Sequence, residues 1–182
     1  MWLQLINYLQ WLSHKLPLEI FCFLGSVIEE IIGPIPSPII LMTSGTIVNQ
    51  RGIHWSYLLI LAIFASAGKT LASWLIYVVA DKAEDFLLSK YGKLLGVSHK
   101  NVEKIGSYFN GTWKDDFLVF IFRAFPVFPT TTVSIASGFI KLDQKSFIRS
   151  TFLGFFIRSL FILYLGYHGI ESFAIIKTWL AE

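Results

Sequence analysis

The chain has 182 residues, of which 54% are hydrophobic, 16% aromatic and only 15% charged, and its net charge is +3. A soluble domain carries about 25% charged residues, so this composition excludes a disordered chain, a basic nucleic-acid-binding domain and an ordinary soluble enzyme. With a mean hydropathy of +0.62, the sequence predicts an all-α integral membrane protein in a single membrane domain. The single cysteine, Cys22, argues against a disulfide framework or a cysteine-rich metal site.

The first two expected elements do not cross the membrane. Residues 1–17 are Trp-rich with apolar residues at helical spacing, which favours an interfacial amphipathic helix; a first transmembrane helix is the alternative. Residues 18–48 are apolar, but Pro34, Pro36 and Pro38 interrupt them after a stretch shorter than the ~20 residues of a span. Because prolines end or kink helices, we predict a re-entrant helical hairpin, which enters and leaves the membrane on the same side.

A full span and a surface segment follow this hairpin. Residues 55–80 are apolar, have aromatic residues near both ends and carry one charge, Lys69, so they predict a transmembrane helix. Residues 81–116 hold 12 of the 27 charged residues, with apolar residues at three- and four-residue spacing. This pattern favours two short amphipathic helices on the membrane surface.

The remaining chain repeats the same order of elements. Residues 117–140 are apolar and are interrupted by Pro126 and Pro129, which predicts a second re-entrant hairpin. Residues 146–168 form the second expected transmembrane helix, with Arg158 near its middle.

The two halves also align residue by residue. A shift of 93 residues superposes Glu30 on Arg123, Pro36 on Pro129, Ser44 on Ser137 and Gly45 on Gly138. With a seven-residue gap in the turn before each span, the same alignment superposes Gly68 on Gly154 and Ser73 on Ser159. One membrane crossing separates the halves, so the second hairpin must enter from the opposite face. The sequence therefore predicts an inverted-topology repeat, a plan that places transport sites at the interface of the repeats.

Two stretches resemble the signatures of the DedA family, also called the VTT or SNARE-associated family. IEEIIGPIPSPIILMTSG is similar to its first signature, and FRAFPVFPTTTVSIASGFIKLDQKSF is similar to its second, which begins Arg-x-x-Pro. The resemblance covers roughly residues 20–168. It implies two opposed re-entrant hairpins and the movement of lipids across bilayers, including undecaprenyl phosphate in bacteria and phospholipids in eukaryotic relatives, with a link to the proton motive force in some bacterial members.

The resemblance also assigns individual positions. Glu29 matches the first acidic residue, Ser37 the serine of the first signature, and Arg123 with Pro126 the Arg-x-x-Pro, while Gly45 and Gly138 match the family's glycines. Two positions depart from the pattern: Pro38 replaces an acidic residue, and Pro129 replaces the second arginine. A mechanism that needs an acid at 38 and a base at 129 is therefore not expected to run unchanged, and the chain resembles a divergent member.

Five charges are expected at bilayer depth, where each costs at least about 2.5–3.5 kcal/mol and so needs a reason. They are Glu29, Glu30, Lys69, Arg123 and Arg158. One interpretation is structural, since the repeat places Glu30 and Arg123 at equivalent depth, where a salt bridge would neutralise both. The functional interpretation is a carboxylate that exchanges a proton near neutral pH and cations that bind a lipid phosphate.

Hydroxyl groups near the second proline break allow the same two interpretations. Thr130 begins a run of Thr and Ser that could donate to a lipid headgroup. In membrane helices such residues more often satisfy backbone carbonyls or permit close packing, and this interpretation is favoured.

The leading functional hypothesis is a membrane lipid translocator that moves a phosphate-bearing lipid between leaflets. A proton-coupled transporter of a small soluble solute and a non-transporting scaffold are the alternatives. The sequence does not indicate an enzyme, and no metal, cofactor or nucleic-acid partner is expected. The expected partners are anionic membrane lipids. Protons and a second copy of the chain are possible further partners. Nine of the Lys and Arg residues fall on the side of 81–116 and 141–149, which predicts that this side is cytoplasmic in a prokaryotic inner membrane.

Overall fold

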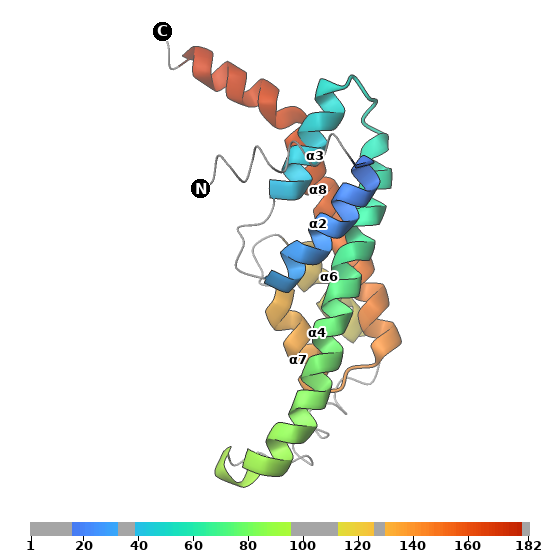
Figure 1. Cartoon of the computed structure of the whole chain (residues 1–182), viewed down its shortest axis with the longest axis vertical. Coiled ribbons are helices and arrows are strands. Elements are labelled where there is room, and N and C mark those ends of the chain that lie inside the picture. Colours follow the sequence, from blue (N-terminus) through green and yellow to red (C-terminus); the bar gives the residue numbers. More distant parts are fainter. Residues whose placement is uncertain (1–15, 33–38, 96–112, 126–129, 180–182) are drawn as a thin grey trace.

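Six helices make up most of the part of the chain that the computed structural model describes. That part comprises residues 16–32, 39–95, 113–125 and 130–179, with side chains described for 16–32, 39–83, 115–125 and 130–169. The helices, which Figure 1 labels, are α2 (Leu18–Ile32), α3 (Ile39–Gln50), α4 (Tyr57–Leu95), α6 (Trp113–Ala124), α7 (Thr130–Phe139) and α8 (Gln144–Trp179). The expectation of an all-helical chain is confirmed for these residues.

Two of the helices are long and apolar enough to cross a membrane. They are the Tyr57–Ala83 part of α4 and the Gln144–Gly169 part of α8, which correspond to the spans expected at 55–80 and 146–168. The sequence placed the start of a separate surface helix at residue 81, whereas α4 continues without a break to Leu95. Residues 81–95 contain no proline, so the sequence has no helix-breaking residue there.

The other four helices form two short pairs. We call α2 with α3 the first helix pair and α6 with α7 the second helix pair. In each pair the helices end and begin on either side of an expected proline break, as proline sterics require. The break residues themselves lie outside the described residues, as does most of the interfacial helix expected at 1–17; those break residues are Pro34, Pro36, Ser37, Pro38, Pro126 and Pro129.

Each long helix packs against one helix from each pair. Helix α4 packs against α2 and α7, helix α8 packs against α6 and α3, and α4 and α8 pack against each other. Exchanging the first half of the chain for the second half therefore leaves these main helix contacts unchanged, although the weaker contacts of α3 with α4 and of α2 with α7 have no equally extensive counterparts. In Figure 1 the first pair lies along the upper part of the long helices, and α7 lies along the lower part of α4.

Glycines bring these helices together at matching positions. A Cβ atom on Gly45 of α3 would run into the carbonyl oxygen of Leu163 on α8, and one on Gly138 of α7 would lie 2.5 Å from the carbonyl oxygen of Tyr77 on α4. The 93-residue shift of the repeat superposes Gly45 on Gly138. The same alignment, with its seven-residue gap, superposes Tyr77 on Leu163. The internal repeat of the sequence thus has a counterpart in the contacts.

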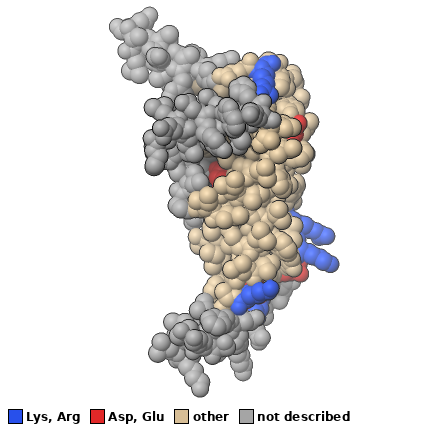
Figure 2. Space-filling view, in the orientation of Figure 1, with Lys and Arg blue, Asp and Glu red and all other residues tan. Residues whose placement is uncertain are grey.

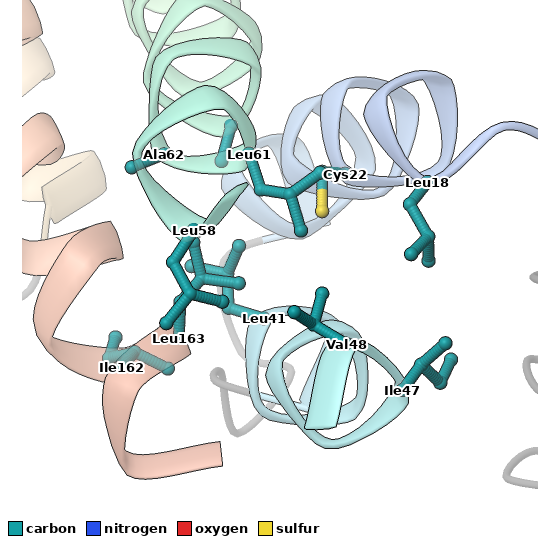
Figure 3. Packing of buried hydrophobic residues seen from close by; sticks show 11 residues of the cluster. Leu18, Cys22, Leu41, Ile47, Val48, Leu58, Leu61, Ala62, Ile162 and Leu163 are labelled. Carbon is teal, nitrogen blue, oxygen red and sulfur yellow. The ribbon is translucent and has the colours of Figure 1, made fainter. Parts of the chain in front are cut away.

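Two apolar clusters lie at different levels along the long helices α4 and α8. The larger cluster joins α2, α3, α4 and α8 through completely buried side chains that include Leu41, Leu58 and Leu163 (Figure 3). The smaller cluster contains Tyr77 of α4 and Phe147 of α8. Along α4 and α8 the residues between the two clusters include most of the buried polar and charged side chains, among them Lys69, Ser73, Arg158 and Ser159.

The outer surface is apolar between two charged ends. Exposed large apolar side chains recur along the long helices, such as Ile63 and Val79 on α4 and Ile157 on α8. Figure 2 shows Lys and Arg side chains near the upper end and in the lower part of the visible face, and a broad band without either between them. An exposed apolar band of this kind is compatible with lipid as its solvent.

Candidate functional site

The ends of α2 and α6 meet through a buried ion pair in the interior of the bundle. Nη1 of Arg123 lies 3.3 Å from Oε1 of Glu30, and the side chains of these two residues are 0% and 2% exposed. Arg123 stands in the last turn of α6 and Glu30 near the end of α2. The salt bridge that the repeat suggested between the two halves is therefore present.

Hydroxyl groups from two further helices complete the coordination of this pair. Ser73 of α4 donates to Oε1 of Glu30 at 2.9 Å, and Thr130 of α7 donates to Oε2 at 2.9 Å. Arg123 donates through Nη1 to the carbonyl oxygen of Thr130 at 2.8 Å and through Nη2 to Oγ of Ser134 at 2.7 Å. Thr130 and Ser134 thus bind the ion pair from within the protein.

Aromatic rings surround the guanidinium group of Arg123. Its Cζ atom lies 4.9 Å from the centroid of the Phe155 ring and 5.5 Å from that of Phe147, both on α8. A cation near an aromatic face gains electrostatic energy when water is excluded. The ring contacts and the three hydrogen bonds that Arg123 donates, to Glu30, Thr130 and Ser134, counteract the desolvation of its buried charge.

A second ion pair lies beside the first. Nζ of Lys69 is 3.2 Å from Oε2 of Glu29, and both side chains are 4% exposed. Lys69 also lies 5.8 Å from the centroid of the Phe155 ring. In contrast to the carboxylate of Glu30, neither carboxylate oxygen of Glu29 accepts a hydrogen bond. The carboxylate of Glu29 therefore depends on the charge of Lys69 for its stabilisation in the interior.

The sequence named Glu29 and Lys69 as candidates but did not pair them. A signal was available on α4, where Ser66, Lys69 and Ser73 recur at three- and four-residue spacing in an otherwise apolar span and so share one face. All three are buried. Ser73 and Ser134, which contact the first ion pair, were not among the predicted site residues.

Arg158 brings a third cation to this region. It is 7% exposed, and its Nη1 donates to the carbonyl oxygen of Phe125 at 3.3 Å, at the residue that follows α6. Both carboxylates act electrostatically on its guanidinium group. We call Glu29, Glu30, Lys69, Arg123 and Arg158 the buried ion cluster; it joins three cations to two carboxylates and has a formal net charge of +1.

The remaining predicted site residues have other positions. Ser37 and the five prolines lie outside the described residues. Gly45 and Gly138 are helix-packing residues, because each meets the backbone of a long helix and neither touches the buried ion cluster. Within the described residues, no group of three or more His, Cys, Asp and Glu side chains could hold a metal ion.

Two curated proteins resemble the chain over most of its length. Both are named "Alkaline phosphatase-like protein"; they come from Lactococcus lactis subsp. lactis (strain IL1403) and Lactococcus lactis subsp. cremoris (strain MG1363), and they are 27% and 26% identical to the chain over 147 residues. The aligned region covers 77% of this chain and 65% of each relative, so the chain spans about two thirds of the length of these relatives. No solved structure matches the chain.

A family model identifies the chain more directly. The model described as the VTT domain matches residues 35–168, which include α3, α4, α6, α7 and most of α8. The matched residues carry Lys69, Arg123 and Arg158 of the buried ion cluster, and the two membrane-length helices agree with a family of membrane proteins. The chain belongs to the VTT domain family, which is also known as the DedA family.

Proposed function

We propose that this protein is a lipid translocator, which moves a phosphate-bearing membrane lipid such as undecaprenyl phosphate or a phospholipid between leaflets. The observation that carries the proposal is the buried ion cluster, which lies where two broken helix pairs meet. Charges at bilayer depth are costly and are associated with transport pathways. The arginine side chains of the cluster suit an anionic cargo, because an arginine fork matches the geometry of a phosphate.

We also propose that the two helix pairs are re-entrant hairpins of an inverted repeat. The exchangeable contacts of the two halves support this arrangement, as does the position of the cluster. Ser73 lies close to the middle of the Tyr57–Ala83 span, and Arg158 lies close to the middle of the Gln144–Gly169 span. Both helix pairs would then bring their proline breaks to the centre of the membrane, where inverted-repeat transporters hold their substrates.

Glu30 occupies the position that we propose for the lipid phosphate. Its two carboxylate oxygens accept hydrogen bonds from Arg123, Ser73 and Thr130, and these are the donors that a phosphate needs. A lipid phosphate that displaces the Glu30 carboxylate would take over these donors from it.

The test is leaflet exchange of a labelled lipid in proteoliposomes, with a panel of anionic and zwitterionic headgroups that includes a polyprenyl phosphate. We expect the protein to accelerate exchange of an anionic lipid, and Arg123→Gln to slow it about 10- to 100-fold, which corresponds to a charged hydrogen bond of ~1.5–3 kcal/mol. Glu30→Gln, which removes the competing negative charge but keeps the size of the side chain, should retain or raise the exchange rate. Arg149→Gln is the matched control, because Arg149 is an exposed arginine of α8.

Three results would contradict the proposal. The absence of acceleration for every headgroup would exclude a translocator of these lipids. Counterflow of a soluble solute that is indifferent to the headgroup would instead favour a proton-coupled solute transporter. If Arg123→Gln and Glu30→Gln changed only the stability, the protein would be a scaffold. We further propose that the chain is not an enzyme. Because the two Lactococcus relatives are named as alkaline phosphatase-like, the purified protein should be assayed for hydrolysis of a phosphate ester. Hydrolysis would contradict this proposal.

A further inference from the structure

A groove of about 200 Å³ runs between α6 and α7, the two helices of the second pair. Its walls include Leu118, Val119 and Phe122 from α6 and Val133, Ala136 and Ile140 from α7. The exposed surface of the groove is almost entirely apolar, although Thr132 and Ser137 also contribute to it. The lining therefore suits a hydrocarbon ligand and offers little to a polar one.

The groove is open to the outside of the bundle and adjoins the buried ion cluster. Leu118 is 44% exposed and Ala136 is also exposed, so the groove reaches the apolar outer surface. At its inner side, Phe122 precedes Arg123 on α6 and Val133 precedes Ser134 on α7. A chain lying in the groove would thus run from the lipid-facing surface toward the cluster.

The first helix pair shows what fills the equivalent space. The 93-residue shift places Gly25 on Leu118 and Ile40 on Val133. In the first pair, Ile40 packs so closely on α2 that a Cβ atom on Gly25 would lie 2.6 Å from its Cδ1 atom, and Cys22 donates to Oγ of Ser44 at 3.1 Å. An aliphatic side chain of the protein itself therefore packs between α2 and α3 at the position equivalent to Val133, which lines the groove between α6 and α7.

We propose that the groove between α6 and α7 binds one hydrocarbon chain of a membrane lipid. The apolar lining, the opening toward the apolar surface and the aliphatic side chain in the equivalent space all favour an aliphatic occupant. The inference rests on the proposed function in one respect: the chain in the groove would belong to the lipid whose headgroup reaches the buried ion cluster.

The experiment is photolabelling of the full chain in liposomes that contain a phospholipid with a diazirine in its acyl chain, followed by mass spectrometric mapping of the adducts. We expect adducts on Phe122, Val133 and Ala136. Ala136→Trp should reduce these adducts about tenfold, the factor expected when roughly two methylene groups lose their burial. Ile135→Trp is the matched control, because Ile135 is a 42% exposed neighbour on α7 that does not line the groove.

Several outcomes would overturn the inference. They are equal groove labelling in the Ala136 and Ile135 variants, adducts spread evenly over the exposed residues of α2 and α8, and crosslinks showing that a second copy or residues 1–17 fill the groove. If Ala136→Trp fails to fold, Val133→Phe tests the same point, because it places a larger side chain at a position that lines the groove. Groove labelling without leaflet exchange would contradict the translocator alone, and exchange without groove labelling would contradict the groove alone.

Discussion

The pairing of Glu30 with Arg123 shows how a single buried contact links two distant parts of the chain. The two residues are 93 positions apart and come from different helix pairs, and both side chains are almost completely removed from solvent. Removing one partner from such a pair leaves the other charge buried and uncompensated, whereas replacing both by apolar residues of similar size is often neutral. The energetic role of the pair can therefore be measured by a double-mutant cycle.

We predict that Arg123→Met lowers the free energy of unfolding by about 3–5 kcal/mol and that Glu30→Leu in the same chain restores most of this loss. The measurement is the denaturant midpoint of the purified protein in detergent. The matched control is Arg149→Met, which should change the stability by less than about 0.5 kcal/mol because Arg149 is exposed. A double variant as unstable as the single variant would contradict the prediction.

The residues of the buried ion cluster differ in how far the sequence revealed them. Glu30 and Arg123 could be paired in advance because the internal repeat placed them at equivalent positions. The pairing of Glu29 with Lys69 could not, because no repeat relates them and their contact depends on how α2 lies against α4. Ser73 was visible as a repeated residue, but its hydrogen bond to Glu30 follows from the same packing.

At the scale of the elements, the ends of α3 and α7 show that the two halves use the same local structure. Both helices end with a residue of positive φ, Gly52 at 65° and Lys141 at 51°. Each is followed by a backbone hydrogen bond back into the helix: Ile53 donates to the carbonyl of Val48, and Leu142 to that of Ser137, both at 3.1 Å. These are the bonds of a Schellman C-cap, which favours glycine.

Glycine also allows two helices to pack closely against each other. We predict that Gly45→Ala lowers the thermal unfolding midpoint and costs about 1–3 kcal/mol, because the new methyl group meets the backbone of α8 at Leu163, which cannot rotate away. The measurement is a thermal melt in detergent.

Gly169→Ala is the matched control, because a Cβ atom at Gly169 of α8 meets nothing within 4 Å. This control should be neutral or should stabilise the helix by up to about 1 kcal/mol. Equal melting temperatures for Gly45→Ala and the wild type would show that α3 can move away from α8 without cost.

At the scale of the whole molecule, the charged ends define an orientation. Arg51 follows α3, and Lys145 stands in the first turn of α8; both side chains are exposed. The band without Lys or Arg in Figure 2 separates the charged ends of the visible face. The excess of Lys and Arg on the side of Lys145 predicts that this side is cytoplasmic.

We predict that Lys145→Cys reacts with a membrane-impermeant thiol reagent only from the cytoplasmic side and Arg51→Cys only from the opposite side. The measurement is mass-shift labelling of inside-out and right-side-out vesicles. The native chain provides the control, because Cys22 is completely buried and should not react. Labelling of both variants from the same side would contradict the opposed arrangement of the two ends, and labelling from exchanged sides would contradict the orientation.

The sequence by itself determined the apolar character of the chain, the two long helices and the positions of the prolines that interrupt it, and it offered the pairing of Glu30 with Arg123 as one interpretation. These follow from hydropathy, from the steric limits of proline and from an internal repeat, all of which are local or periodic properties of the chain. Only the tertiary structure decided that α4 continues to Leu95, that Lys69 pairs with Glu29 and that an apolar groove lies between α6 and α7. Those features depend on which faces of packed helices meet, and side-chain packing between distant segments fixes this choice.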